Sequence, residues 1–131
     1  MLAAGSVIYL EVAFRQGGRN KYLVVLDVDT KVHTLTVNTE INPFFGLGEF
    51  GKCYVEIDQH SHQFLEHNSF IDCNQIIKLN LPDVIAEMRS NSDCVKGSLS
   101  NNVVTAVIAA IQRTPGISPH DKSHYCGCLT R

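Results

Sequence analysis

The first half of the chain consists of short β-branched and aromatic segments, and this feature restricts the fold to one built on a sheet. Residues 6–14 (SVIYLEVAF) and 21–28 (KYLVVLDV) are two such segments, and Gly17 and Gly18 lie between them. Two apolar runs separated by a glycine-containing turn predict a β-hairpin.

Two further strands are predicted at residues 31–39 and 52–58. In the second of these, Cys53, Val55 and Ile57 alternate with polar or amphipathic residues. Because successive side chains of a strand point to opposite faces, one face of this strand should lie in the core and the other in water. The segment 41–51 is rich in Gly and typical of a loop.

A fifth strand is predicted at residues 69–78, although polar residues occur on both of its faces. Alternation divides the segment into two sets: Phe70, Asp72, Asn74 and Ile76 on one face, and Ile71, Cys73, Gln75 and Ile77 on the other. A mixed face on a small barrel is where a groove opens.

Helical patterns come late in the chain. Residues 81–91 predict a short helix, and residues 100–114 predict a longer one with Ser100 as its N-cap and Pro115 after its end. We therefore predict one domain spanning residues 1–131, mainly β with α: a small antiparallel β-barrel, closed or partly open, with a C-terminal helix. From about residue 114 we predict an irregular tail.

Composition narrows the functional classes. The chain has 131 residues, a formal net charge of −2 and a pI near 6.3, which argues against a surface that is basic throughout. No apolar run is long enough for a membrane span, and the start resembles no signal peptide, so we expect no membrane contact and a cytoplasmic location. The five cysteines should mostly be free thiols.

Positive charge gathers around the predicted hairpin turn. Arg15, Arg19 and Lys21 flank the glycine pair. A guanidinium beside a flexible turn can bind phosphate, because its donors match the phosphate oxygens; the alternative is a solvated turn. Thr39 and Glu40 end the third predicted strand, where a hydroxyl could hold a phosphate and a carboxylate could accept a proton.

Metal-binding patterns are weak. His60, His62 and His67 lie between two cysteines without the tight spacing of a zinc site. In the tail, His120, His124, Cys126 and Cys128 lie within nine residues, but an irregular end is the preferred interpretation. We expect no metal and no cofactor in the functional site.

The order of these segments resembles the PemK/MazF family of toxin endoribonucleases. The resemblance runs from GSVIYLEV through KYLVVLDV, LTVNT and SFIDCNQIIKL to VKGSLSNNVVTAVIAAI, covering about residues 5–112. It implies an SH3-like barrel that forms a homodimer, cleaves single-stranded RNA as a hydrolase without a metal, and is silenced by a cognate antitoxin protein.

The resemblance also implies roles for particular residues. The family's basic residue at the start of the second strand, usually followed by Pro, would fall on Lys21, here followed by Tyr22, with Arg19 nearby. Its catalytic Thr would fall on Thr39, so the implied catalytic residues are Lys21, Arg19 and Thr39. The residues expected to bind RNA are Arg15, Glu40, Asp72, Asn74 and Gln75. His33 is a further candidate for moving protons, beside Glu40 and Asp72.

A second interpretation stays open at this stage. The same barrel would serve as a non-catalytic SH3-like module that binds protein or RNA, since the Arg-Pro pair typical of the family is missing.

Overall fold

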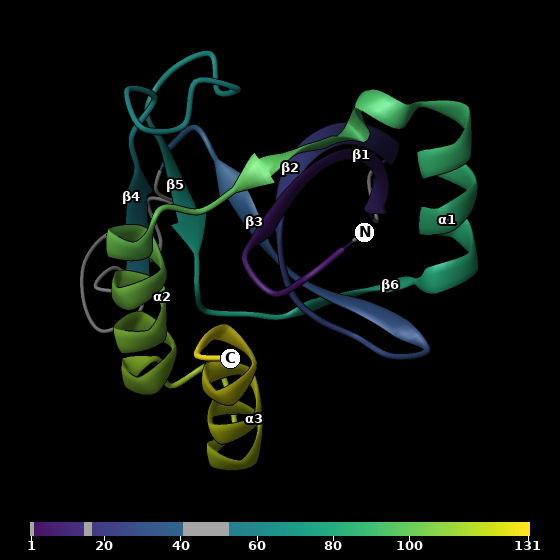
Figure 1. Ribbon diagram of the computed structural model, residues 1–131. Coiled ribbons are helices and arrows are strands. Elements are labelled where there is room, and N and C mark those ends of the chain that lie inside the picture. The colour runs from purple at the N-terminus through teal and green to yellow at the C-terminus, as the bar shows by residue number, and fades with distance from the viewer. Residues whose placement is uncertain (1, 15–16, 41–52) are drawn as a thin grey trace.

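The computed structural model describes residues 2–14, 17–40 and 53–131. It describes the side chains of all these residues except 11–14 and 17–19. Arg15 and the predicted loop at residues 41–51 lie outside this part of the chain. Helices and strands are numbered along the chain as in Figure 1. They are β1 (Ser6–Phe14), β2 (Gly17–Val28), β3 (Lys31–Asn38), β4 (Tyr54–Ile57), β5 (Ser69–Asp72), β6 (Ile77–Asn80), α1 (Leu81–Ser90), the 3₁₀ turn η2 (Ser92–Cys94), β7 (Val95–Ser98), α2 (Asn101–Arg113) and α3 (Pro119–Leu129).

The strands form one strongly curved antiparallel sheet. Their order is β4-β5-β3-β2-β1-β7, and β6 also pairs with β3. The predicted hairpin is present as β1 and β2, with Val7 opposite Val24 and Tyr9 opposite Tyr22. The predicted fold class, a small antiparallel barrel with a helix near its C-terminus, is confirmed.

Strand β2 is buried on both faces, which explains its unbroken apolar run. Leu23 and Val25 belong to a core that α1 covers through Val84. Val24 and Leu26 belong to a larger core under α2 and α3. Figure 1 shows α1 on one side of the sheet and the other two helices on the opposite side. A strand between two cores favours continuous hydrophobicity over alternation.

The predicted strand at residues 69–78 is wrong in one respect: it is two strands. β5 ends at Asp72 and β6 begins at Ile77. Between them, the Asp72 carboxylate accepts hydrogen bonds from the backbone N–H of Asn74 (2.9 Å) and from its side-chain amide (3.0 Å). A side chain that bonds the backbone two residues ahead competes with the sheet ladder and turns the chain.

The prediction of an irregular tail is also wrong, because α3 occupies Pro119–Leu129. Ser118 caps its first turn by accepting from the N–H of Asp121, and Pro119 suits the first helical position. The buried side chains Tyr125, Cys126 and Leu129 join the larger core. These residues form no simple apolar stripe in the sequence, so the helix depends on tertiary contacts.

Helix α2 confirms its prediction, including the N-cap at Ser100. Its buried side chains are Val103, Val107, Ala110 and Ile111. Among the described residues, no helix combines the length and apolar character that crossing a bilayer requires.

The connection between α2 and α3 is held to the sheet by a small polar network. The Thr114 hydroxyl donates to Asn74 Oδ1 (2.8 Å) and accepts from the N–H of Gly116 (3.1 Å). Gly116 packs so closely on the Asn74 backbone carbonyl that a Cβ would overlap it.

We predict that Gly116→Ala destabilises the protein by about 1–3 kcal/mol, the cost of overpacking a tight contact. Gly127→Ala is the matched control, because the space around this exposed helical glycine is open. The control should stabilise by about 0.5–1 kcal/mol, since Ala restricts the unfolded chain. Urea unfolding of both variants measures the difference, and equal stability of the two would contradict the predicted contact.

Candidate functional site

One face of the sheet presents polar and aromatic side chains from four adjacent strands. Asn38 of β3 lies opposite Phe70 of β5, and Phe70 lies opposite Glu56 of β4. One step along, Asp72 lies opposite Tyr54. Residues opposite one another, or two apart on one strand, share a face. We call this surface the polar sheet face; its members are Lys21, Thr36, Asn38, Tyr54, Glu56, Phe70 and Asp72.

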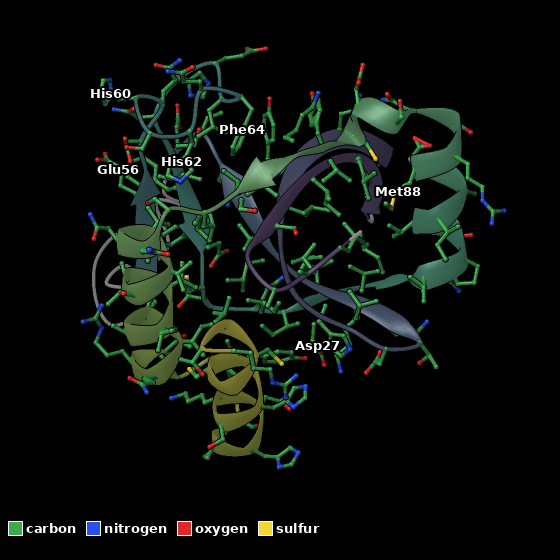
Figure 2. The ribbon with its side chains drawn as sticks, viewed as in Figure 1. Asp27, Glu56, His60, His62, Phe64 and Met88 are labelled. Carbon is green, nitrogen blue, oxygen red and sulfur yellow. The ribbon has the colours of Figure 1, made fainter. Side chains whose placement is uncertain are left out.

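Burial separates this face from the core face of the same strands. Each of its seven members is exposed or half-buried. The residues that alternate with them, Val37, Val55 and Ile71, are buried in the larger core. Figure 2 shows Glu56 at the outer edge of the sheet. Asp72, the polar residue that ends the apolar run of β5, therefore lies at this surface.

Lys21 supplies the positive charge of this face. Its Nζ donates to Asn38 Oδ1 across the β2–β3 pair at 2.8 Å. Asn38 is a neutral acceptor, so this bond orients the ammonium through its amide oxygen. A cation held in this way is suited to contact a phosphate oxygen.

Two carboxylates and an aromatic ring complete the arrangement. Asp72 is half-buried and accepts both bonds from Asn74 at the same oxygen, Oδ1. Glu56 is exposed. Phe70 is half-buried and lies opposite Glu56 and two residues before Asp72 on β5. Strands lie about 4.8 Å apart, so Lys21 and Phe70 are separated by roughly 10 Å, a span that one nucleotide can bridge.

The predicted catalytic residues belong to neighbouring strands, β2 and the end of β3. Thr39 and Glu40 follow Asn38 in an exposed bend just beyond β3. Arg19 belongs to β2, where its backbone pairs with Val12. The β2–β3 pairing thus brings Lys21 beside the segment that carries Thr39.

The three residues predicted from the interrupted strand separate in the structure. Asp72 joins the polar sheet face, whereas Asn74 is buried and bonded to Thr114. Gln75 is exposed in the connection between β5 and β6. The contacts of Asn74 are those of a residue that fixes a turn.

Sequence reasoning missed the contributions of Glu56 and Phe70 to this face. The sequence did contain part of the signal for this face, because the alternation of residues 52–58 predicted a wet side that includes Glu56. What the sequence could not supply was the order β4-β5-β3-β2, which joins that wet side to Lys21.

A group of aromatic side chains supports the loop between β4 and β5. Tyr22 stacks on Tyr9 with ring centroids 4.5 Å apart and lies 6.1 Å from the ring of Phe64. Its hydroxyl donates to the Phe64 carbonyl at 2.9 Å. Burial, and then the neighbouring Tyr9 and Glu66, raise the pKa of Tyr22, so the phenol stays protonated as this donor.

His62, one of the histidines of this loop, has a structural role. His62 is buried, and its Nδ1 donates to the Asp58 carbonyl at 2.9 Å. Its Nε2 accepts the backbone N–H of Ser100 at 3.0 Å, which ties the loop to the start of α2. Figure 2 shows His62 in the loop beside Phe64. Accepting at Nε2 requires the neutral ring with its proton on Nδ1.

His33, a candidate for moving protons, lies far from the polar sheet face. It is buried near the start of β3, roughly 16 Å along the strand from Asn38. Its Nε2 donates to the Asp29 carboxylate (3.0 Å), and its Nδ1 accepts the Tyr125 hydroxyl (2.6 Å). One ring nitrogen therefore braces the β2–β3 turn, and the other holds α3 to this hairpin.

Comparison with known proteins shows a relation of fold. Neither a family model nor a curated protein sequence matches the chain. Among solved structures, the chain is similar to one chain of a MazE–MazF crystal structure from Deinococcus radiodurans. The TM-score is 0.58 at 15% sequence identity, and the match covers 89% of this chain and 98% of the other.

Tyr125 yields a prediction on alkaline stability. Burial, followed by the carboxylates of Asp121, Asp27 and Asp29, raises the pKa of Tyr125 to about 12. The unfolded chain ionises first, near pH 10, so the free energy of unfolding should fall between about pH 10 and 12. Urea unfolding across this range should show a shallower loss for Tyr125→Phe than for the native protein. Tyr9→Phe, which removes a phenol from β1, is the control and should retain the steep loss that Tyr125 causes; equal slopes for native protein and Tyr125→Phe would contradict the prediction.

Proposed function

We propose that this protein is a toxin-type endoribonuclease of a toxin–antitoxin system, which cleaves single-stranded RNA by metal-independent acid/base chemistry. The observation that carries the proposal is the polar sheet face, where a fixed ammonium, an aromatic ring and two carboxylates lie on one side of a curved sheet. The fold similarity to a chain of a MazE–MazF structure supports it.

The arrangement suits an unpaired RNA strand. Phe70 offers a half-exposed ring on which a base can stack, and Lys21 lies one strand spacing beyond Asn38, where the adjoining phosphate would fall. The Asn38 amide and the Thr36 hydroxyl can bond base edges or the 2′-hydroxyl, the group that distinguishes RNA from DNA.

The reaction that fits these groups is attack by the ribose 2′-oxygen on the neighbouring phosphorus. A carboxylate, for which Asp72 and Glu56 are the candidates on the face, takes the 2′-hydroxyl proton as the new O–P bond forms. The bond to the 5′-oxygen breaks, and that oxygen receives a proton, which leaves a 2′,3′-cyclic phosphate and a 5′-hydroxyl. Lys21 stabilises the additional negative charge at phosphorus.

The remaining predicted residues have supporting roles in this proposal. Thr39 would orient the phosphate from the end of β3, and Glu40 beside it is a further proton acceptor. Arg19 of β2, and Arg15 four residues before it in the sequence, would contact neighbouring phosphates of the same RNA strand.

The proposal includes the protein's partners. A cognate antitoxin would silence the enzyme by covering the polar sheet face, and the active form would be a homodimer in the cytoplasm. An acidic antitoxin segment would compete with RNA for Lys21, because both present negative charge.

The first test measures cleavage. Purified protein, with EDTA present, is incubated with a long single-stranded RNA, and cut sites are read by primer extension. We expect discrete cuts, and a loss of roughly 100-fold in kcat/KM for Lys21→Ala, the usual effect of removing one group that stabilises transition-state charge. Lys78→Ala, an exposed lysine of β6, is the control and should cleave normally.

Two outcomes would overturn the proposal. Equal cleavage by Lys21→Ala and Lys78→Ala would place the activity elsewhere or in a contaminant. Intact RNA with folded protein that still binds RNA would favour the non-catalytic binding module.

A second test measures binding separately from chemistry. Phe70→Leu keeps an apolar side chain but removes the flat ring, so its affinity for a short single-stranded RNA should fall roughly 5- to 100-fold. Ile85→Ala, which shortens an exposed apolar side chain of α1, should leave the affinity unchanged. Fluorescence anisotropy with a labelled oligonucleotide makes the comparison, and equal affinities would exclude Phe70 as a stacking platform.

A further inference from the structure

A second group of reactive side chains lies where α3 meets the end of β2, at the opposite end of the sheet from Lys21. His124 Nε2 is 2.7 Å from Asp27 Oδ2 and 3.9 Å from Cys128 Sγ. These three atoms, an oxygen, a nitrogen and a sulfur, all lie within 4.8 Å of one another. Figure 2 shows Asp27 beside the C-terminal helix.

The elements explain why the three side chains converge. His124 and Cys128 are four residues apart in α3, so they occupy the same face of the helix one turn apart. Asp27 is the penultimate residue of β2, against which α3 packs. The members of this group differ in exposure. Cys128 is buried, whereas the His124 side chain is 45% exposed, so its imidazole can be reached from solvent.

The geometry does not fit a cysteine nucleophile with its base. In such a relay the imidazole uses one nitrogen toward the nucleophile and the other toward the carboxylate. Here the same atom, Nε2, faces both Asp27 and Cys128. Burial and the Asp27 carboxylate also raise the pKa of the Cys128 thiol, which opposes activation.

Three donor atoms from different side chains that lie within 4.8 Å of one another are close enough to share one metal ion. We propose that Asp27, His124 and Cys128 form a binding site for a Zn²⁺-class cation, with three protein ligands and one exchangeable position. The combination of thiolate, imidazole and carboxylate selects Zn²⁺ or Co²⁺ over Mg²⁺ and Ca²⁺, which prefer oxygen ligands alone. On binding, the thiol proton passes to solvent and the sulfur bonds to the metal.

Small side-chain movements would complete the site. Zinc bond lengths place tetrahedral nitrogen and oxygen ligands about 3.4 Å apart, and nitrogen and sulfur ligands about 3.6 Å apart. On metal binding, the 2.7 Å separation of His124 Nε2 from Asp27 Oδ2 must widen and the 3.9 Å separation of His124 Nε2 from Cys128 Sγ must narrow. Each change is less than about 1 Å.

A hollow of about 330 Å³ provides room for the fourth ligand. Asp27 and Cys128 line it, together with Ala3, Ala4 and Arg131. An open coordination position beside such a hollow holds water or a small anion, whereas a purely structural zinc site is closed by four protein ligands.

Neighbouring residues do not form an equally good site. Asp27, Asp29 and His33 also lie close together, but this group contains no sulfur donor, and Nδ1 of His33 is bonded to Tyr125. Of the other candidates in the tail, Cys126 directs its thiol to the Ile108 carbonyl, and His120 lies exposed in the first turn of α3. The structure thus separates His124 and Cys128 from the four-residue pattern seen in the sequence.

The experiment is a titration of the reduced protein with Co²⁺, followed by displacement with Zn²⁺. We expect one equivalent of Co²⁺ to produce the intense visible bands of tetrahedral coordination and a near-ultraviolet sulfur-to-cobalt charge-transfer band, both removed by Zn²⁺. Cys128→Ser should abolish the charge-transfer band. His124→Ala and Asp27→Asn should weaken Co²⁺ binding at least about tenfold.

Cys126→Ser and His120→Ala are the matched controls, because each removes the same donor type from α3 outside the site. They should bind Co²⁺ as the native protein does. Weak octahedral spectra at saturating Co²⁺, or a charge-transfer band that survives in Cys128→Ser, would overturn the proposal. His124→Ala removes a half-exposed side chain, so it keeps the test decisive if the Asp27 variant folds poorly. Because absorbance is the readout, the result is independent of any ribonuclease activity.

Discussion

The architecture depends on how one edge of β3 is shared. β5 pairs with its C-terminal half through Val37 and Asn38, and β6 pairs with its N-terminal half from Lys31 to Thr34. The chain can change from one pairing to the other because the Asp72 carboxylate captures the N–H and amide of Asn74 and turns the backbone. This turn separates β5 from β6, so that each pairs with a different half of β3.

The same turn links the curvature to the helices. Asn74 accepts the Thr114 hydroxyl, so the point where the sheet bends is also the point where the α2–α3 connection docks. Leaving a buried polar group without its hydrogen bond costs free energy, so this network helps to fix the position of α3. Helix α3 then reaches the β2–β3 hairpin, where Tyr125 bonds His33. One carboxylate thus shapes the polar sheet face directly and the position of α3 indirectly.

Local patterns predicted what local forces determine. The buried run of β2, the alternation around Val55 and the capped helix after Ser100 were all visible in the sequence, because burial periodicity and capping act over a few residues. The division of residues 69–78 and the helix after Ser118 were missed. Both carry a local signal, the Asx turn at Asp72 and the Ser-Pro start of α3, but each is stabilised by distant partners.

The candidate site shows the same limit more strongly. Lys21 and Thr39 were identified from their types and positions, but their neighbours were not, since Phe70 and Glu56 arrive through pairings of strands more than thirty residues away from Lys21. Likewise, the tail offered four metal-ligand candidates, and only the packing of α3 on Asp27 distinguishes His124 and Cys128 from His120 and Cys126.

The two polar groups therefore place different demands on the fold. The polar sheet face stays wet, because its seven members are exposed or half-buried while Val37, Val55 and Ile71 fill the core, and its charges can meet a ligand at low desolvation cost. The group at Asp27 is partly enclosed by α3, where burying carboxylate, imidazole and thiol together is costly unless each has a partner. These groups already bond one another, and a cation at their common centre would bind all three at once. It would also hold α3 at the end of the sheet, where its own sequence gives it little amphipathic character.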